Sequence, residues 1–495
     1  MSERTLEAQP NATAQPPDAS SSKSSARWRL PSFVRRHPEW STAIIVLIVS
    51  LVVVVWARTR PGFDPYGWLV WGHQTITGSL DTNAAPSWKP LPWVFTAPYA
   101  LAGHYELFLW MVTSVAISLS GVVFAARIAH RLTDAPAERR WAGWVAAAFA
   151  GLAVLGIQNY SHYVLSAQSD PMIVSLCLGA IDCHLSQRPR AAFVLGVLAG
   201  LGRPEAWPFL GLYSIWAWRT VPRVRALLVA GWAAIVLLWF GIPLITSRSA
   251  FVAANNAMGS GRRLTNGQII GTIKRFLAIN ELPVELAALV AVGLAVWRRH
   301  RVVLALTAAT VAWVVIEIGF ALHGWPGLIR YMFEAGGVVV VLAGVAVGWL
   351  LAGRWAAPAL TRRLGPVLTR WLGPALVAVL TLSLVPAAIS HERDGHKDLH
   401  VQRLRTAEIK ALTPVIDRLG GAARIRACGE PLTRLEYQTM LAYTLALNVS
   451  KVGFKYGKAI ARGNPIILFT PYPTKTGWVV KAMHQTSPAC RSLPH

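Results

Sequence analysis

The sequence predicts an α-helical polytopic membrane protein with about eleven transmembrane helices, followed by a small C-terminal α/β domain outside the membrane. Composition is the first reason: 54% of the 495 residues are hydrophobic, only 14% are charged, and the mean hydropathy is +0.42. A soluble chain of this length would carry far more charge on its surface. The second reason is that apolar segments long enough to cross a bilayer follow one another, separated by short arginine-rich loops.

The transmembrane bundle is expected over residues 41–390. Residues 1–40, rich in Ser, Ala and Pro, predict a disordered cytoplasmic tail, and no apolar run near Met1 indicates a signal peptide. The stretch 191–218 is too long for one span and is interrupted by GRPEAWP, which predicts two short helices meeting near the outer surface. The other spans are expected at residues 41–57, 106–128, 141–157, 170–186, 226–246, 282–297, 302–321, 331–352 and 374–390.

Basic residues predict the orientation in a plasma (inner) membrane. The presumed inner loops, such as HRLTDAPAERR and WRRHR, are all basic, whereas outer segments 158–169 and 321–329 contain no Lys or Arg. The positive-inside rule then places the N-terminus in the cytoplasm and residues 391–495 outside, although the long outer loop 247–281 carries five Lys or Arg residues. The same inner loops account for the net charge of +25, so we expect no nucleic-acid partner.

Residues 391–495 have the character of a soluble domain. Their first part predicts a helix, and the later apolar runs PIILFT and GWVVKA predict strands. Cys428 and Cys490 lie here, and two cysteines outside an oxidising membrane face suit a disulfide. Cys177 and Cys183 lie in an expected span, where they are interpreted as small apolar core residues. No CxxC spacing indicates a zinc site.

The stretch GFDPYGWLVWGHQ lies in a large first outer loop, residues 58–105, and places Asp64 where the first span should meet water. Apolar and aromatic residues follow at helical spacing over residues 66–76, as expected of an amphipathic helix lying in the membrane interface. One interpretation is structural: Asp64 caps this helix, Pro65 begins it, and the aromatic residues form an interfacial belt. No role is assigned to His73.

A functional interpretation takes in further ionisable residues at the expected outer ends of the spans. Asp170 and Arg330 have structural alternatives, because the first can cap its helix and the second can extend to the interface. Arg203 can pair locally with Glu205. Taken together, carboxylates and cations suit a lipid-phosphate substrate, because cations stabilise a phosphate leaving group and an aspartate can activate an acceptor hydroxyl. The residues concerned are Asp64, Lys89, Asp170, Arg203 and Arg330.

Five short motifs over residues 41–350 resemble, in order, those of the multi-span glycosyltransferases of the GT-C fold. The resemblance is to the branch that includes protein O-mannosyltransferases and aminoarabinose transferases. The motifs are FDPYGWLVWGHQTITGSLD, WKPLPW, SDPMIVSLCLGAID, LAGLGRPEAWPF, with Arg203 in place of the family's lysine, and RYMFEAGGVVVVLAG. The resemblance implies catalytic carboxylates at Asp64 and Asp170, and binding of the donor phosphate by Lys89, Arg203, Arg330 and Tyr331.

The same resemblance implies a cell-envelope enzyme that moves a hexosyl or pentosyl group from a polyprenyl-phosphate sugar to an extracytoplasmic hydroxyl, with inversion. The acceptor is a glycan, a lipid or a protein. Many relatives have two adjacent acids where this chain has Asp64 and Pro65, which argues against a metal held by a paired acidic motif. A divalent metal ion shared by Asp64 and Asp170 remains an alternative to Asp64 acting as a plain base, which is favoured.

Two other classes of function are left open by the sequence. A transporter or flippase of lipid-linked or anionic solutes would explain the broken helix at 191–218, although no internal repeat is found. A non-catalytic membrane scaffold would use the bundle only to support the outer domain. A composition rich in Ala, Val, Arg and Trp is typical of a GC-rich genome. Together with the resemblance to this enzyme family, it indicates a bacterium of actinobacterial type that builds a complex envelope.

Overall fold

A computed structural model describes residues 38–264, 267–355, 365–472, 477–485, 487–490 and 493. Most of the expected N-terminal tail, residues 1–37, lies outside the described residues. The chain divides into two units, residues 1–45 and 46–495, and the fold and the site described below belong to the second.

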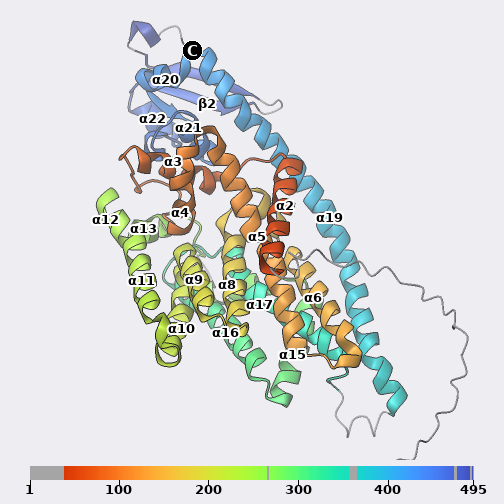
Figure 1. Cartoon of the computed structure of the whole chain (residues 1–495). Coiled ribbons are helices and arrows are strands. Elements are labelled where there is room, and N and C mark those ends of the chain that lie inside the picture. The colour runs from red at the N-terminus through yellow and green to blue at the C-terminus, as the bar shows by residue number, and fades with distance from the viewer. Residues whose placement is uncertain are drawn as a thin grey trace, which may run out of the picture. The chain divides into compact units, whose positions relative to one another are not determined.

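Each span expected from the sequence coincides with a helix (Figure 1). The helix of the first span begins at Pro38, ahead of the expected residue 41. The broken stretch 191–218 is two helices joined by a short 3-10 turn that begins at Pro204, which has no backbone N–H to continue the preceding helix. The helices are α2 (Pro38–Ala57), α5 (Glu106–Thr133), α6 (Arg140–Leu155), α8 (Ser169–Leu185), α9 (Pro189–Gly202), η3 (Pro204–Ala206), α10 (Trp207–Thr220), α11 (Arg225–Val236), η5 (Leu237–Gly241), α12 (Ile242–Thr246), α15 (Leu282–Arg298), α16 (Arg301–Leu322), α17 (Phe333–Leu351) and α19 (Pro366–Arg418).

The described helices include six that are long and apolar enough to cross a bilayer, or seven if the bent pair α14 (Gln268–Leu277) and α15 forms one span. Others, such as α6 with 16 residues and α8 with 17, are shorter than the roughly 20 residues that a perpendicular crossing needs. The expected number of about eleven spans therefore stays a prediction. The apolar helices make the chain an integral membrane protein.

Helix α17 lies at the centre of the bundle, and every one of its residues is buried. It packs against α5, α6, α8, α15 and α16, which a helix that is hydrophobic all round can do (Figure 1). Small residues permit the close approach: a Cβ atom on Gly344 would lie 2.7 Å from that of Ala150 on α6. The 3-10 turn η6 (Ile329–Met332) leads directly into α17, so the buried helix α17 fixes the position of the turn that carries Arg330.

The expected outer loops are largely helical. The loop 58–105 contains α3 (Phe63–Ile76) and α4 (Pro90–Tyr99), and α3 agrees with the helix expected over 66–76. Shorter helices fill the other connections. These are α7 (Tyr160–Leu165), α13 (Val252–Met258) and α14.

The C-terminal region combines helices with a three-stranded sheet. Helix α19 runs without a break through residue 391, the expected start of a separate domain, and continues to Arg418. The runs PIILFT and GWVVKA form strands, as predicted. Strand β2 pairs in parallel with β1, Ile466 opposite Glu430, and antiparallel with β3 (Figure 1). The elements are α20 (Gly421–Cys428), β1 (Glu430–Leu432), α21 (Gln438–Thr444), α22 (Tyr456–Ala461), β2 (Ile466–Pro471) and β3 (Trp478–Met483).

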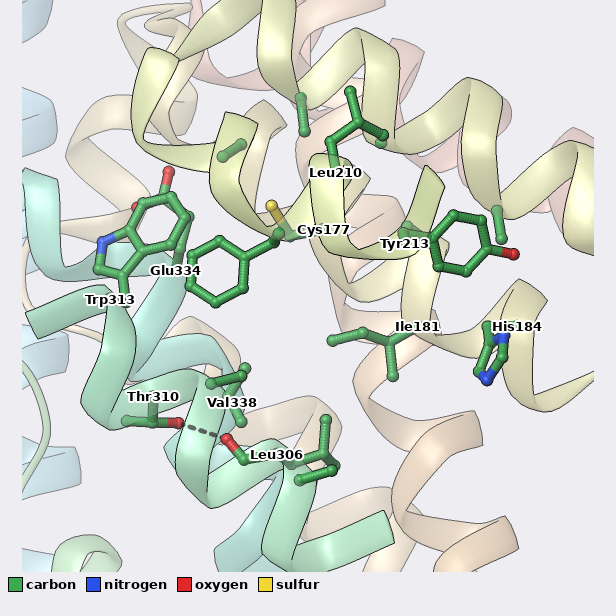
Figure 2. A pocket seen from close by; sticks show the side chains of 18 of the residues that line it. Cys177, Ile181, His184, Leu210, Tyr213, Leu306, Thr310, Trp313, Glu334 and Val338 are labelled. Carbon is green, nitrogen blue, oxygen red and sulfur yellow. Dashed lines mark hydrogen bonds between the residues drawn. The ribbon is translucent and has the colours of Figure 1, made fainter. Parts of the chain in front are cut away.

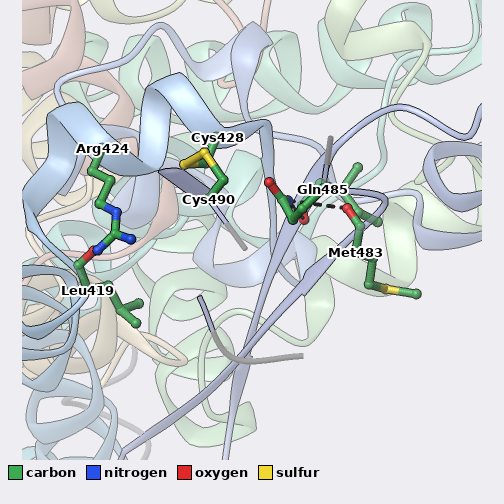
Figure 3. The surroundings of a disulfide bond; sticks show 7 residues. Leu419, Arg424, Cys428, Met483, Gln485 and Cys490 are labelled. Carbon is green, nitrogen blue, oxygen red and sulfur yellow. Dashed lines mark hydrogen bonds between the residues drawn. A yellow bond between two sulfur atoms is a disulfide. The ribbon is translucent and has the colours of Figure 1, made fainter. Parts of the chain in front are cut away.

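A disulfide joins Cys428, at the end of α20, to Cys490, beyond β3 (Figure 3). Their Cα atoms are 5.6 Å apart, and both residues are buried. Gln485 reinforces the same corner, because its side-chain amide donates hydrogen bonds to the carbonyl oxygens of Ile466 and Met483. The segment after β3 is thus tied covalently to the helix that precedes β1. Cys177 and Cys183 form no disulfide, and both lie on α8.

Candidate functional site

Asp64 belongs to the first turn of α3 but does not cap it. The N-cap residue is Gly62, and no side chain supplies a cap hydrogen bond. Pro65 occupies the third helical position, where its missing N–H costs nothing because the first turn has no intrahelical acceptor. The interpretation of Asp64 as an N-cap is therefore wrong. Its side chain is 23% exposed, so it stays accessible to solvent.

Asp170 repeats this arrangement at the start of α8. The helix begins at Ser169 with Gln168 at the N-cap, and Asp170 is followed by Pro171 just as Asp64 is followed by Pro65. The capping interpretation is therefore wrong for Asp170 as well. Unlike Asp64, its side chain is only 1% exposed. A buried carboxylate requires cationic or hydrogen-bonding partners.

Arg330 supplies one of those partners and lies between the two aspartates. Its Nη2 is 3.6 Å from Asp64 Oδ2, and its Nε is 3.8 Å from Asp170 Oδ2. The ring of Tyr163 packs 5.8 Å from the guanidinium carbon. Arg330 therefore turns toward the carboxylates and does not extend to the interface, which corrects that alternative. Its guanidinium thus pairs with both of the carboxylates that a shared metal ion would use.

Lys89 brings a second cation to the same place from another element. It is the N-cap residue of α4, and its Nζ donates a 3.2 Å hydrogen bond to the hydroxyl of Ser169, next to Asp170. Four segments far apart in the chain thus converge here: the first turn of α3, the start of α4, the start of α8 and the turn η6. They bring together Asp64, Lys89, Asp170 and Arg330.

Arg203 also reaches this cluster, but from its buried side. The residue is 2% exposed and donates hydrogen bonds to Asp170 and to the carbonyl oxygen of Arg330. Its guanidinium carbon lies 4.3 Å from the ring centroid of Tyr331. Three glutamates surround the rest of the guanidinium, with N–O distances of 3.3 Å for Glu334, 3.8 Å for Glu317 and 3.9 Å for Glu205.

This enclosure changes the interpretation of Arg203. The sequence grouped it with Lys89 and Arg330 as a ligand of a donor phosphate, but its guanidinium is surrounded by carboxylates and closed to solvent. The local pair with Glu205 is the longest of its four ion pairs. Arg203 is therefore placed to neutralise buried carboxylates. Lys89 and Arg330 are left as the cations that can face a phosphate.

Sequence reasoning missed Glu317 and Glu334. Each is a single carboxylate in an otherwise apolar run, in VVIEIG of α16 and in YMFEAG at the start of α17. An ionisable residue inside a predicted span is itself a signal of a buried ionic site. Among the described residues, no group of three or more His, Cys, Asp or Glu side chains is arranged to hold a metal ion.

An apolar cavity of about 500 Å³ lies next to this cluster, between α8, α9, α10, α16 and α17 (Figure 2). Glu334 and Trp313 line one end, and His184 and Tyr213 line the other (Figure 2). Alkyl and aromatic side chains such as Leu210 and Val338 make up most of its wall. Since Glu334 also pairs with Arg203, the cavity and the ionic cluster share a wall.

The C-terminal region holds the segment that carries Asp64. Thr439 of α21 donates a 2.7 Å hydrogen bond to the carbonyl oxygen of Phe63. On α19, the hydroxyl of Thr406 accepts from the backbone N–H of Arg60 at 2.8 Å, and Arg405 Nη2 donates to the carbonyl oxygens of Arg60 and Pro61 at 3.2 and 3.1 Å. The entry into α3 is therefore fixed by residues more than 340 positions away in sequence.

The far end of α3 is held by His73. Its Nε2 lies 2.8 Å from Oε1 of Glu106, which is fully buried at the start of α5. The hydrogen bond to Glu106 raises the pKa of His73 above its usual value. Tyr443 of α21 packs against both His73 and Tyr66, with ring centroids 5.9 and 5.3 Å apart. Both ends of α3 thus contact α21.

No protein-family model and no curated protein matches this sequence. The chain is similar in structure to ArnT from Cupriavidus metallidurans in the apo state. The TM-score is 0.53 at 16% sequence identity, over 88% of this chain and 94% of that chain. The fold is of the GT-C type. A second structure of ArnT, bound to undecaprenyl phosphate, matches with a TM-score of 0.49 at 16% identity, over 92% of this chain and 97% of that chain.

This similarity bears out the expected fold class. ArnT is a polytopic membrane glycosyltransferase of the GT-C fold, and this chain has the same fold. This chain also has a small C-terminal sheet. At 16% identity the likeness concerns the fold. The protein O-mannosyltransferase branch and the actinobacterial type stay predictions.

Proposed function

We propose that this chain is a glycosyltransferase that moves a hexosyl or pentosyl group from a polyprenyl-phosphate donor to a hydroxyl outside the cytoplasm, with inversion. One observation carries the proposal: Arg330 lies between a partly exposed aspartate, Asp64, and a buried one, Asp170, with Lys89 bound to the neighbouring Ser169. An accessible carboxylate beside two cations provides both a base and a site for a phosphate leaving group. The GT-C fold supports the same conclusion by analogy.

The proposed reaction is a single displacement. The acceptor oxygen attacks the anomeric carbon, the bond from that carbon to the phosphate oxygen breaks, and the phosphate leaves with the electron pair. Asp64 takes the proton of the acceptor hydroxyl. Lys89 and Arg330 stabilise the charge that develops on the phosphate, and Asp170 holds Arg330 in place. Attack opposite the leaving group inverts the anomeric centre.

The apolar cavity supports a donor with a lipid tail. Its volume of about 500 Å³ lies in the range of ligand sites, and its wall is made chiefly of alkyl and aromatic side chains. A polyprenyl chain entering it would place its phosphate near the end where Glu334 contacts Arg203. Next to that end lie Arg330 and Lys89.

The carboxylates of Glu205, Glu317 and Glu334 need Arg203 for neutralisation, so we assign Arg203 to organising the site.

A transporter or flippase and a non-catalytic scaffold are less well supported. A transport site would place its ionisable groups near the middle of the spans. Here Asp64, Asp170 and Arg330 all lie at the first turns of their elements. A scaffold would not need a partly exposed carboxylate whose helix is held by a hydrogen bond from the C-terminal region.

We further propose that the bundle, residues 41–390, lies in the plasma membrane with its N-terminus in the cytoplasm and residues 391–495 outside. In intact cells, a membrane-impermeant thiol reagent should then label Ser450→Cys and leave Arg299→Cys unlabelled. The reverse pattern would mean the opposite orientation.

A transfer assay tests the function. Purified protein in nanodiscs is offered a panel of radiolabelled polyprenyl-phosphate sugars with envelope glycan, lipid and protein acceptors. Wild type should transfer or slowly hydrolyse one donor. Asp64→Asn keeps the shape of the side chain but removes the base, so turnover should fall by about 100-fold or more.

The matched control is Asp134→Asn. Asp134 caps the end of α5 in a left-handed conformation that asparagine also adopts, and it pairs with Arg354 away from the site. This variant should keep full turnover. Absence of turnover with every donor, together with unchanged donor binding in Asp64→Asn, would favour a transporter or a scaffold instead.

A further inference from the structure

A second groove lies outside the site described above, along the last two turns of α2. Its volume is about 610 Å³. It is separate from the cavity beside Glu334, which is lined by α8, α9, α10, α16 and α17. The six lining residues are Leu51, Val52, Val55, Trp56, Arg58 and Arg403.

The wall of this groove is apolar and faces away from the protein. Val52, Val55 and Trp56 are 61%, 63% and 57% exposed, although they belong to a helix of strongly apolar sequence. Such exposure is costly in water and favourable against lipid acyl chains. We therefore place this face of α2 in contact with the hydrocarbon of the bilayer.

The upper rim of the groove is cationic. Arg403 of α19 donates from Nε to the carbonyl oxygen of Ala57 at 2.9 Å, and from Nη2 to that of Trp56 at 3.0 Å. Its guanidinium carbon lies 5.6 Å from the ring centroid of Trp56. Arg58 follows the helix directly, is exposed and has a φ of +54°. None of the six lining residues is a carboxylate, so the rim has a net positive charge.

We propose that this groove binds one anionic glycerophospholipid of the surrounding leaflet. An acyl chain lies against Leu51, Val52 and Val55, and the phosphodiester faces Arg58 and Arg403. An apolar wall below two cations matches the layout of such a lipid at the membrane interface, where basic side chains attract anionic headgroups. This lipid site does not depend on the proposed transferase function, and binding can be measured without any sugar donor.

Because Arg403 lies two and three residues before Arg405 and Thr406, the lipid would bind beside the part of α19 that holds Arg60 and Pro61. The proposed site is thus structural in character: it connects α2 to α19 at the point where the chain turns toward α3. It differs in chemistry from the donor site, which has carboxylates among its cations.

The test measures lipid binding by native mass spectrometry of the whole protein released from detergent. Phosphatidylglycerol should bind wild type, and phosphatidylcholine of the same chain length should bind at least fivefold more weakly. Arg58→Gln should weaken phosphatidylglycerol binding by about fivefold, since each basic residue near the surface contributes that much to anionic-lipid binding. Arg58→Gln combined with Arg403→Gln should weaken it by about 25-fold.

Arg299→Gln is the matched control. Arg299 is also an exposed arginine at the end of an apolar helix, with a φ of +53°, but it does not line the groove. This variant should bind phosphatidylglycerol as wild type does. If the Arg403 substitution unfolds the protein, Arg58→Gln alone against Arg299→Gln still decides the question.

Three results would overturn the proposal. Equal binding of phosphatidylglycerol and phosphatidylcholine would mean an ordinary lipid contact without headgroup selection. Displacement of phosphatidylglycerol by glycerol 3-phosphate at equal concentration would mean that the acyl chain plays no part. Tighter binding of a polyprenyl phosphate that Arg58→Gln abolishes would assign the groove to the donor lipid.

Discussion

Thr439 donates a hydrogen bond from its side-chain hydroxyl to the backbone carbonyl oxygen of Phe63, the residue before Asp64. Thr439 is fully buried and belongs to α21, in the C-terminal region. The contact therefore connects a short helix near the sheet to the first turn of α3. Through it, the C-terminal region contributes directly to the position of the accessible carboxylate.

The first prediction concerns this contact. Thr439→Val removes the hydroxyl at nearly constant volume, and with it one hydrogen bond to the carbonyl of Phe63, which should cost about 0.5–1.5 kcal/mol of stability. A small displacement of Asp64 should lower kcat by about tenfold or more and leave the KM for the donor nearly unchanged. Steady-state kinetics in nanodiscs measure both constants.

Thr439→Ser retains the hydroxyl and should restore most of the rate. Thr444→Val is the matched control, because the hydroxyl of Thr444 donates its hydrogen bond to the carbonyl oxygen of Met440 within the same helix. If Thr439→Val matched wild type in kcat, α21 would have no part in positioning Asp64.

The second prediction separates the roles of Arg203 and Lys89. Arg203→Met leaves four carboxylates around an apolar side chain, so the free energy of unfolding should fall by about 3–5 kcal/mol. Lys89→Met loses one hydrogen bond, to Ser169, and should instead raise the KM for the donor by about tenfold or more. Thermal unfolding and donor titration of both variants provide the comparison.

Arg203→Lys keeps the charge but not the planar fork, so we expect a stability between those of wild type and Arg203→Met. A stable Arg203→Met variant with a raised donor KM would return Arg203 to the phosphate-binding residues.

The third prediction is a pH dependence at His73. Its pair with Glu106 raises the pKa of His73 in the folded protein above the value in the unfolded chain. The stabilisation is therefore fully present below the unfolded pKa, about 6.5, and is lost as the pH rises through the higher folded pKa. The difference in unfolding temperature between wild type and His73→Gln should be largest below pH of about 6.5 and shrink above it.

His104→Gln serves as the comparison. His104 is exposed, and its ring packs on that of the neighbouring residue Tyr105. Its stability should follow the wild-type pH profile. A His73→Gln variant whose deficit stayed constant from pH 5 to 9 would show that the pair carries no net charge-dependent stabilisation.

The fourth prediction concerns the disulfide. Cys428 and Cys490 are separated by 62 positions, and closing a loop of that length should stabilise the folded state by roughly 4 kcal/mol. Cys428→Ser with Cys490→Ser should therefore increase proteolysis of the region from α20 to β3. The bundle should keep its helical circular dichroism. Cys177→Ser, on α8, should leave the proteolysis unchanged.

Much of this architecture could be predicted from the sequence because the signals are local. Apolar runs mark the helices of the bundle, and GRPEAWP marks the break between α9 and α10, where Pro204 has no backbone N–H to continue α9. The runs PIILFT and GWVVKA become β2 and β3 because short apolar runs of this kind favour strands. Ionisable residues at the ends of apolar runs single out Asp64, Asp170 and Arg330, because a charge near the hydrocarbon needs a partner.

The tertiary structure alone decided which of these charges pair. The chain close to Arg203 offers only Glu205, but folding brings Asp170, Glu317 and Glu334 from three other helices around its guanidinium. In the same way, Thr439 reaches Phe63 across 376 positions. Such contacts depend on how the buried helix α17 packs its neighbours, and no local pattern encodes that packing. The sequence by itself therefore determined the membrane helices and the candidate charges, and the packing of the bundle decided what each charge can do.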